Sequence, residues 1–264
     1  MSLALSRQFA AARLSLVVEQ KPLDSGRRVD SVEIVQLDIA RTLAREEYRL
    51  FPGNTRTNRI EVTAADRSQR QLVLVVDEPR RAFTVTVPRF RAIAPTPGLR
   101  IVSETETQRV VEMQTSGRLR HFLCGQDEQH LFIAQLPRAC ANVQDAHEAL
   151  APEIPPEYQR GVHRRQGEWF FLPITAEERA ELNVVDPKLI RSGGLAEVAR
   201  IRRHGRQHLA TQAVVIEKGN RLYARGQIWH PDHAPLALRG WHRVLINREP
   251  FESVPRRVGI RWVD

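Results

Sequence analysis

Short segments with a two-residue hydrophobic period dominate this chain, and they constrain its fold more than any other feature. Apolar and β-branched residues alternate with polar ones in runs such as 59–63, 71–76, 82–87 and 109–113, and polar turns separate these runs. Alternation of this kind is typical of strands with one buried face, and short turns join antiparallel neighbours. The chain shows no regular alternation of strands with helices. The sequence therefore predicts an α+β fold with mainly antiparallel sheets and a few short helices.

Helical spacing of apolar residues is confined to three brief stretches. Residues 38–48 and 143–150 each place several apolar side chains on one face of a helix. Residues 175–182 begin with Thr175 and carry Glu178 three positions later, which is the pattern of a capping box at a helix start. These stretches predict three short helices.

Two pairs of predicted strands are close enough in sequence to form hairpins. The first pair flanks Asp77-Glu78-Pro79-Arg80, with the proline in its loop. The second pair, 209–217 and 221–229, is the clearer one, and Lys218-Gly219-Asn220 supplies its turn.

Two proline-rich stretches indicate how the chain divides. Residues 151–156 (APEIPP) are the strongest linker, because proline ends the helix predicted before them. Residues 92–98 (AIAPTPG) form either a second boundary within the first half or only a long loop. We therefore expect a strand-rich N-terminal region, 1–150, with two subdomains split near 92–98, and an α+β C-terminal region, 157–264, rich in histidine and arginine.

The chain is strongly basic, and arginine carries almost all of the positive charge. The net charge is +9, and 37 of the 40 basic residues are arginines. A GC-rich codon supply explains arginine in place of lysine, but it does not explain the sign of the charge. The net charge is +6 over 1–100, −4 over 101–160 and +7 over 161–264. Guanidinium groups pair with phosphates and stack on bases, so nucleic acid is the expected partner. The acidic middle also allows internal docking or an acidic protein partner.

The length of apolar runs and the number of cysteines indicate the cellular compartment. No apolar run approaches the roughly 20 residues of a membrane span. Cys124 and Cys140 are the only cysteines, too few for a disulfide framework. We expect a soluble cytoplasmic protein that does not associate with membranes. Cys124 and His130 could face each other as a nucleophile pair, but a buried structural thiol is the favoured interpretation.

Histidines gather in the C-terminal region. Six of the nine lie between 163 and 242. His230 and His233 bracket Asp232 after the predicted hairpin, which suggests a divalent metal site made of these three residues. A metal-free alternative uses imidazoles as acid and base in RNA cleavage through the ribose 2′-hydroxyl. The candidate catalytic residues are His204, His208, His230 and His242.

Arginines near these histidines are candidates for contacting phosphates. One group follows the predicted linker and precedes three consecutive aromatic residues, and another lies in a glycine-containing loop before the hairpin. The candidate nucleic-acid-binding residues are Arg164, Arg165, Arg202, Arg203, Arg206 and Arg225. A solvated run of charge and a buried aromatic strand are the structural alternatives for these segments.

Three functions are compatible with these patterns. The first is a nucleic-acid-binding protein, acting as a nuclease or nucleic-acid-processing factor through the C-terminal histidines. The second is a basic adaptor or assembly subunit that binds an acidic protein and catalyses nothing. The third is a metallohydrolase of a small anionic substrate.

Overall fold

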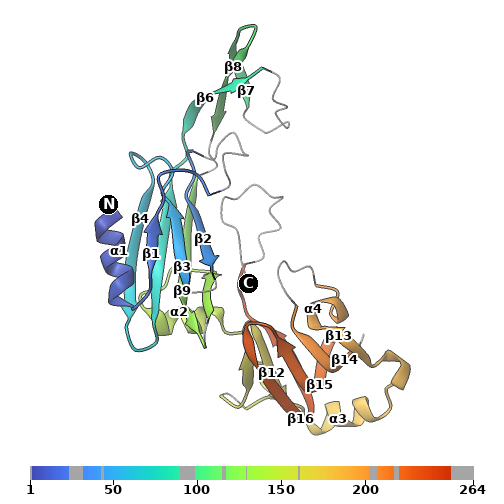
Figure 1. Ribbon diagram of the computed structural model, residues 1–264. Helices are drawn as coiled ribbons and strands as arrows, with labels where there is room; N and C mark the ends of the chain where they lie inside the picture. Colours follow the sequence, from blue (N-terminus) through green and yellow to red (C-terminus); the bar gives the residue numbers. More distant parts are fainter. Residues whose placement is uncertain are drawn as a thin grey trace. The chain divides into compact units, whose positions relative to one another are not determined.

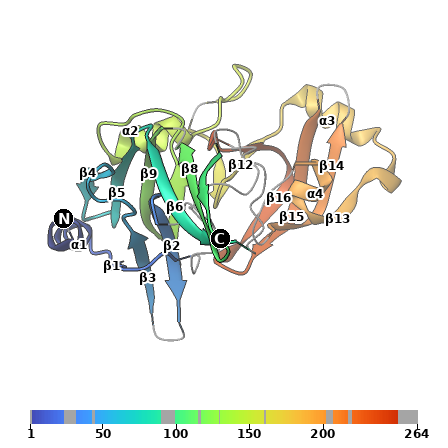
Figure 2. The same cartoon turned by 90° about the horizontal axis from the view of Figure 1, so that it is seen from above.

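Strands dominate the fold, and most of them pair antiparallel (Figures 1 and 2). A computed structural model of the chain describes residues 2–23, 32–42, 45–89, 99–114, 117–128, 130–159, 161–201, 207–216 and 220–250. Within these residues four sheets are accompanied by a few short helices, which confirms the predicted character of the sheets. No helix in the described ranges is long and apolar enough to cross a membrane.

The chain forms two compact units. Unit 1 contains the described residues of Met1–Gln126 and Leu131–Ala146, and unit 2 contains those of Asp127–His130 and His147–Glu249. The linker predicted at 151–156 stays a prediction. The subdomain split predicted at 92–98 lies outside the described residues.

Unit 1 is built around a core shared by two sheets and the first helix. Leu5 and Phe9 of α1 are buried, and the Phe9 ring meets the Tyr48 ring edge-on with centroids 5.4 Å apart. The Tyr48 hydroxyl donates to the carbonyls of Gly125 and Phe132, both at 2.7 Å, which joins the two sheets. The elements are α1 (Ser2–Ala11), the sheet β1 (Leu16–Val18), β3 (Glu46–Phe51) and β2 (Gln36–Arg41), and the sheet β10 (His130–Gln135), β9 (Arg118–Asp127), β5 (Gln71–Glu78) and β4 (Arg59–Asp66).

A small third sheet completes unit 1. It contains β6 (Ala82–Pro88), β8 (Gln108–Gln114) and β7 (Arg100–Glu104) in that order. Val87, Val111 and Met113 form its buried cluster.

Unit 2 contains a six-stranded sheet that carries apolar side chains on both faces. Leu195 of α4 packs with Ala224 and Val244, whereas Leu182 of α3 packs with Tyr223. Tyr223 and Ala224 are neighbours in one strand, so these two clusters lie on opposite faces of the sheet. The strand order is β11 (Arg164–Gln166), β12 (Trp169–Pro173), β16 (His233–Ile246), β15 (Arg221–His230), β14 (Leu209–Ile216) and β13 (Arg191–Gly194), and the helices are α3 (Ala176–Asn183), the 3₁₀ turn Pro187–Leu189 and α4 (Leu195–Val198). The helix α2 (Val143–Leu150) begins in unit 1 and ends in unit 2.

Two sequence predictions are wrong. The described residues of 38–48 form no helix: residues 38–41 belong to β2 and residues 46–48 to β3, and the two strands pair antiparallel with Ile39 opposite Tyr48. Both side chains are buried from strand positions, so their apparent helical spacing has no structural role. The hairpin at 77–80 is also absent, because β5 pairs with β4 and β9 while β6 pairs with β8. With β4 on one edge and β9 on the other, β5 has no free edge for β6.

Other local predictions are confirmed. The helix at 143–150 forms with the predicted bounds. Thr175 caps α3, and its capping box with Glu178 is complete. β14 and β15 form the predicted hairpin, whose turn residues 217–219 lie outside the described ranges. Cys124 is fully buried, and burial raises the pKa of its thiol, which disfavours the thiolate that a nucleophile needs.

Candidate metal centre

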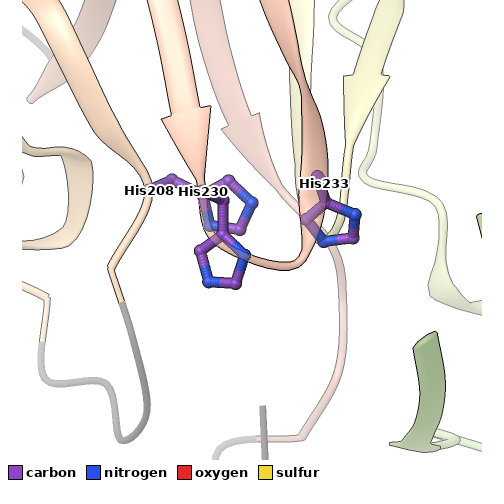
Figure 3. A group of neighbouring side chains, drawn as sticks. All are labelled: His208, His230 and His233. Carbon is purple, nitrogen blue, oxygen red and sulfur yellow. The ribbon is translucent and has the colours of Figure 1, made fainter. Parts of the chain in front are cut away.

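Three histidines meet at one end of the six-stranded sheet (Figure 3). His208 immediately precedes β14, His230 ends β15 and His233 begins β16. Leu209 pairs with Trp229 across β14 and β15, and His230 pairs with His233 across the turn between β15 and β16. One potential ligand atom from each imidazole lies within 4.8 Å of the others. The ends of three neighbouring strands thus bring together residues that are up to 25 positions apart in the sequence.

The ring of His208 stacks against both other rings, whereas the rings of His230 and His233 are tilted to each other by 38°. The rings of His208 and His230 are stacked, with centroids 4.2 Å apart and planes 16° apart. The centroid of His233 is 5.1 Å from that of His230 and 5.5 Å from that of His208. An imidazole binds a metal through a lone pair in its ring plane. One ion cannot lie in two stacked planes, so His208 or His230 must rotate when both bind the same ion.

The ligand atoms must come closer together to hold one ion. The nitrogen ligands of a tetrahedral zinc ion lie about 3.4 Å apart, since each Zn–N bond is about 2.0–2.1 Å, whereas the potential ligand atoms here lie within 4.8 Å of one another. His208 and His230 are buried, with 3% exposure each, and His233 is partly exposed, so His233 offers the more open side of the group.

Neighbouring groups bear on which ring nitrogen is available. Glu168 Oε1 lies 3.8 Å from His208 Nδ1, beyond hydrogen-bond distance, while Nε2 of this ring is directed toward Gly167. The backbone N–H of Asp232 donates to His230 Nδ1 at 3.2 Å. A neutral His230 therefore carries its proton on Nε2. Metal binding through Nε2 would move this proton to Nδ1, and Nδ1 could then no longer accept the hydrogen bond from Asp232.

Gly167 allows the imidazole edges to approach the turn between β11 and β12. A Cβ atom added at this glycine would lie 3.0 Å from His233 Nε2 and 3.1 Å from His208 Nε2. Both nitrogens therefore face the same point beside the glycine Cα. The backbone of Gly167 is left-handed, with φ of +56°, which disfavours residues with a side chain. Arg165 Nε donates to the Gly167 carbonyl at 2.7 Å and holds this turn.

Replacing Gly167 by alanine is expected to weaken metal binding by about 10-fold or more, because the new methyl group presses on the two facing nitrogens. It should also lower stability by about 1–2 kcal/mol through left-handed strain. Gly161→Ala is the matched control, since Gly161 has φ of +80° but nothing within 4 Å of an added Cβ. Zinc titration and urea denaturation of both variants separate the two effects. Equal zinc affinity in the two variants would contradict the role given to Gly167.

The other residues predicted to bind metal or act in catalysis do not join the group of three histidines in the described part of the chain. Asp232 meets His230 through its backbone, and its carboxylate is not among the ligand atoms within 4.8 Å of one another. His242 lies within β16 opposite Ala224, and its Nδ1 is 2.8 Å from the Gly240 carbonyl oxygen, so it does not join the three histidines. The remaining predicted residues His204, Arg202, Arg203 and Arg206 lie outside the described ranges.

Three of the candidate nucleic-acid-binding arginines lie within the described residues, and each contacts a neutral group. Arg164 donates to the carbonyl of Ala237. Arg165 lies over the Phe170 ring, with Cζ 5.5 Å from its centroid. Arg225 lies over the Trp241 ring, with Cζ 4.5 Å from its centroid. Glu168 and Gly167, which sequence reasoning did not single out, lie directly before the predicted aromatic strand, and no spacing signal connects them to the histidines.

Comparison with known proteins adds no assignment: no family model, no curated protein and no solved structure matches the chain.

Proposed function

We propose that this protein binds a divalent transition metal through His208, His230 and His233 and uses it to hydrolyse phosphodiester bonds in nucleic acid. The observation that carries the proposal is the convergence of the three imidazoles at the strand ends. Neutral imidazole suits zinc and neighbouring transition metals. Three protein ligands leave one coordination position of a tetrahedral ion for water, which is the arrangement of catalytic rather than structural sites.

The chemistry follows from such a site. A bound metal lowers the pKa of a coordinated water, so that hydroxide forms near neutral pH. The hydroxide attacks phosphorus, the P–O bond to the leaving oxygen breaks, and the leaving oxygen takes up a proton. The products are a phosphate monoester and a free hydroxyl group. The net charge of +9 favours a polyanionic substrate, and arginine pairs with phosphate oxygens in bidentate geometry.

The test is hydrolysis by metal-stripped protein before and after adding back Zn²⁺ or Mn²⁺. We expect the reconstituted protein to cleave labelled RNA or DNA, and EDTA to abolish cleavage. RNA cleavage that persists in EDTA would replace this proposal with acid–base catalysis by histidine alone. Hydrolysis restricted to a small diester would favour a metallohydrolase of small anions. A protein that binds neither metal nor nucleic acid would leave the acidic-partner adaptor as the remaining hypothesis.

A further inference from the structure

The other face of the same strand ends carries exposed aromatic and cationic groups. Ala224 and Ile228 of β15 pack in one buried cluster, so Arg225 and Trp229, each one residue further on, project from the opposite face. Trp241 belongs to the cluster on that opposite face, together with Tyr223. This face therefore presents two tryptophans and an arginine from adjacent strands.

Two large apolar side chains on this face are exposed. Trp229 is 46% exposed, and Leu209, its partner across β14 and β15, is 42% exposed. Trp229 precedes His230 and Leu209 follows His208. The exposed pair thus lies at the strand ends that carry the histidines, but on the other side of the sheet. This exposed pair and the histidines therefore lie at the same end of the sheet.

Arg225 is held in place by neutral groups. Its guanidinium lies over the Trp241 ring, with Cζ 4.5 Å from the centroid, and its Nε donates to the side-chain oxygen of Gln212. Within the described part of the chain, neither partner carries a charge that would neutralise the guanidinium. A stacked and oriented arginine of this kind keeps its charge and its outer N–H donors for an anionic ligand. Arg239, two residues before Trp241 in β16, is also exposed.

We propose that the surface formed by Leu209, Arg225, Trp229 and Trp241 binds single-stranded nucleic acid. An exposed indole stacks on any nucleobase, while the oriented guanidinium pairs with the backbone phosphate. A duplex hides its base faces, so this combination favours single strands. The inference deepens the proposed function by naming the form of its substrate, and it requires no metal.

The experiment measures anisotropy of a fluorescein-labelled 15-nucleotide oligo(dT), an oligo(U) of equal length and a matched duplex, all in EDTA. We expect both single strands to bind more tightly than the duplex and to quench tryptophan fluorescence. Trp229→Ala should weaken single-strand binding at least about 5-fold, the equivalent of one lost base stack of about 1 kcal/mol. Arg225→Gln should weaken it and lower the dependence of binding on salt.

Two exposed positions provide matched controls. Arg179→Gln removes the same charge from the surface of α3, and Leu189→Ala removes an apolar side chain that is 54% exposed. Both should bind as the unchanged protein does. Equal affinity for single strands and duplex, or unchanged binding by folded Trp229→Ala, would overturn the inference. Absence of all nucleic-acid binding would also overturn it and indicate a protein as the occupant. Because EDTA is present, failure of metal-dependent hydrolysis does not affect this outcome.

Discussion

Replacing His230 by alanine is expected to weaken zinc binding by more than about 100-fold. Removing a group that merely orients a metal ligand costs about 10- to 100-fold in affinity. Loss of a ligand itself should exceed that range, because it reduces the group from three imidazoles to two. Zinc affinity is measured by competition with a chromophoric chelator, and the d–d absorption of added Co²⁺ reports the coordination geometry. His242→Ala is the control, since His242 lies outside the group of three.

Two further variants separate an effect on zinc binding from an effect on folding. His230 is only 3% exposed, so its truncation can perturb folding; His233→Ala, at a partly exposed position, tests the same site with less disturbance of the core. Glu168→Gln keeps the shape of the side chain near His208 but removes its charge, and should weaken zinc binding by about 10-fold or more. Zinc binding that is equal in folded His233→Ala and His242→Ala would show that the three imidazoles do not form a metal site.

The sequence was sufficient to predict the hairpin that builds this site, but not its register. Near the turn, Ile216 pairs with Arg221, and a regular ladder continued from this pair would place His208 opposite Trp229. An irregularity between Ala210 and Gln212 shifts the register, so Leu209 faces Trp229 and His208 is brought level with His230. Gly226, with φ of +86°, lies at this point in β15. A bulge of one residue leaves no periodic signal, yet it decides which side chains meet.

Prediction succeeded where local chemistry determines structure and failed where tertiary pairing does. The capping box of Thr175 and Glu178 acts within one helical turn, and it is present as predicted. Residues 38–48 have a helical spacing of apolar side chains, but the pairing of β2 with β3 overrides it. The three histidines were recognised as candidates by type and region. Their grouping depends on the order β16, β15, β14 in the sheet, which composition does not encode.

The second large expected effect concerns a buried ion pair in unit 1. Arg120 of β9 and Glu78 of β5 form a salt bridge whose side chains are 4% and 8% exposed. Glu78 Oε1 also accepts a hydrogen bond from the backbone N–H of Val35 at 2.7 Å, which links the strand to the segment before β2. The Arg120 guanidinium lies over the Phe122 ring, with Cζ 5.7 Å from the centroid. Both ends of the pair are therefore fixed in a site with little solvent.

Glu78→Ala is expected to destabilise unit 1 by about 3–5 kcal/mol, because it leaves the charge of Arg120 buried without its carboxylate and removes the acceptor for Val35. Glu78→Gln retains a carbonyl acceptor and isolates the effect of the charge. Adding Arg120→Met to Glu78→Gln should recover part of the loss, since a buried pair of apolar or neutral groups needs no compensating charge. Urea denaturation followed by far-UV circular dichroism measures each step.

The control is Arg45→Ala, which breaks an exposed ion pair. Arg45 is 70% exposed and pairs with Glu47, so its loss should change the free energy of unfolding by less than about 1 kcal/mol. A Glu78→Gln variant as stable as Arg45→Ala would show that the buried pair contributes no more than a surface pair.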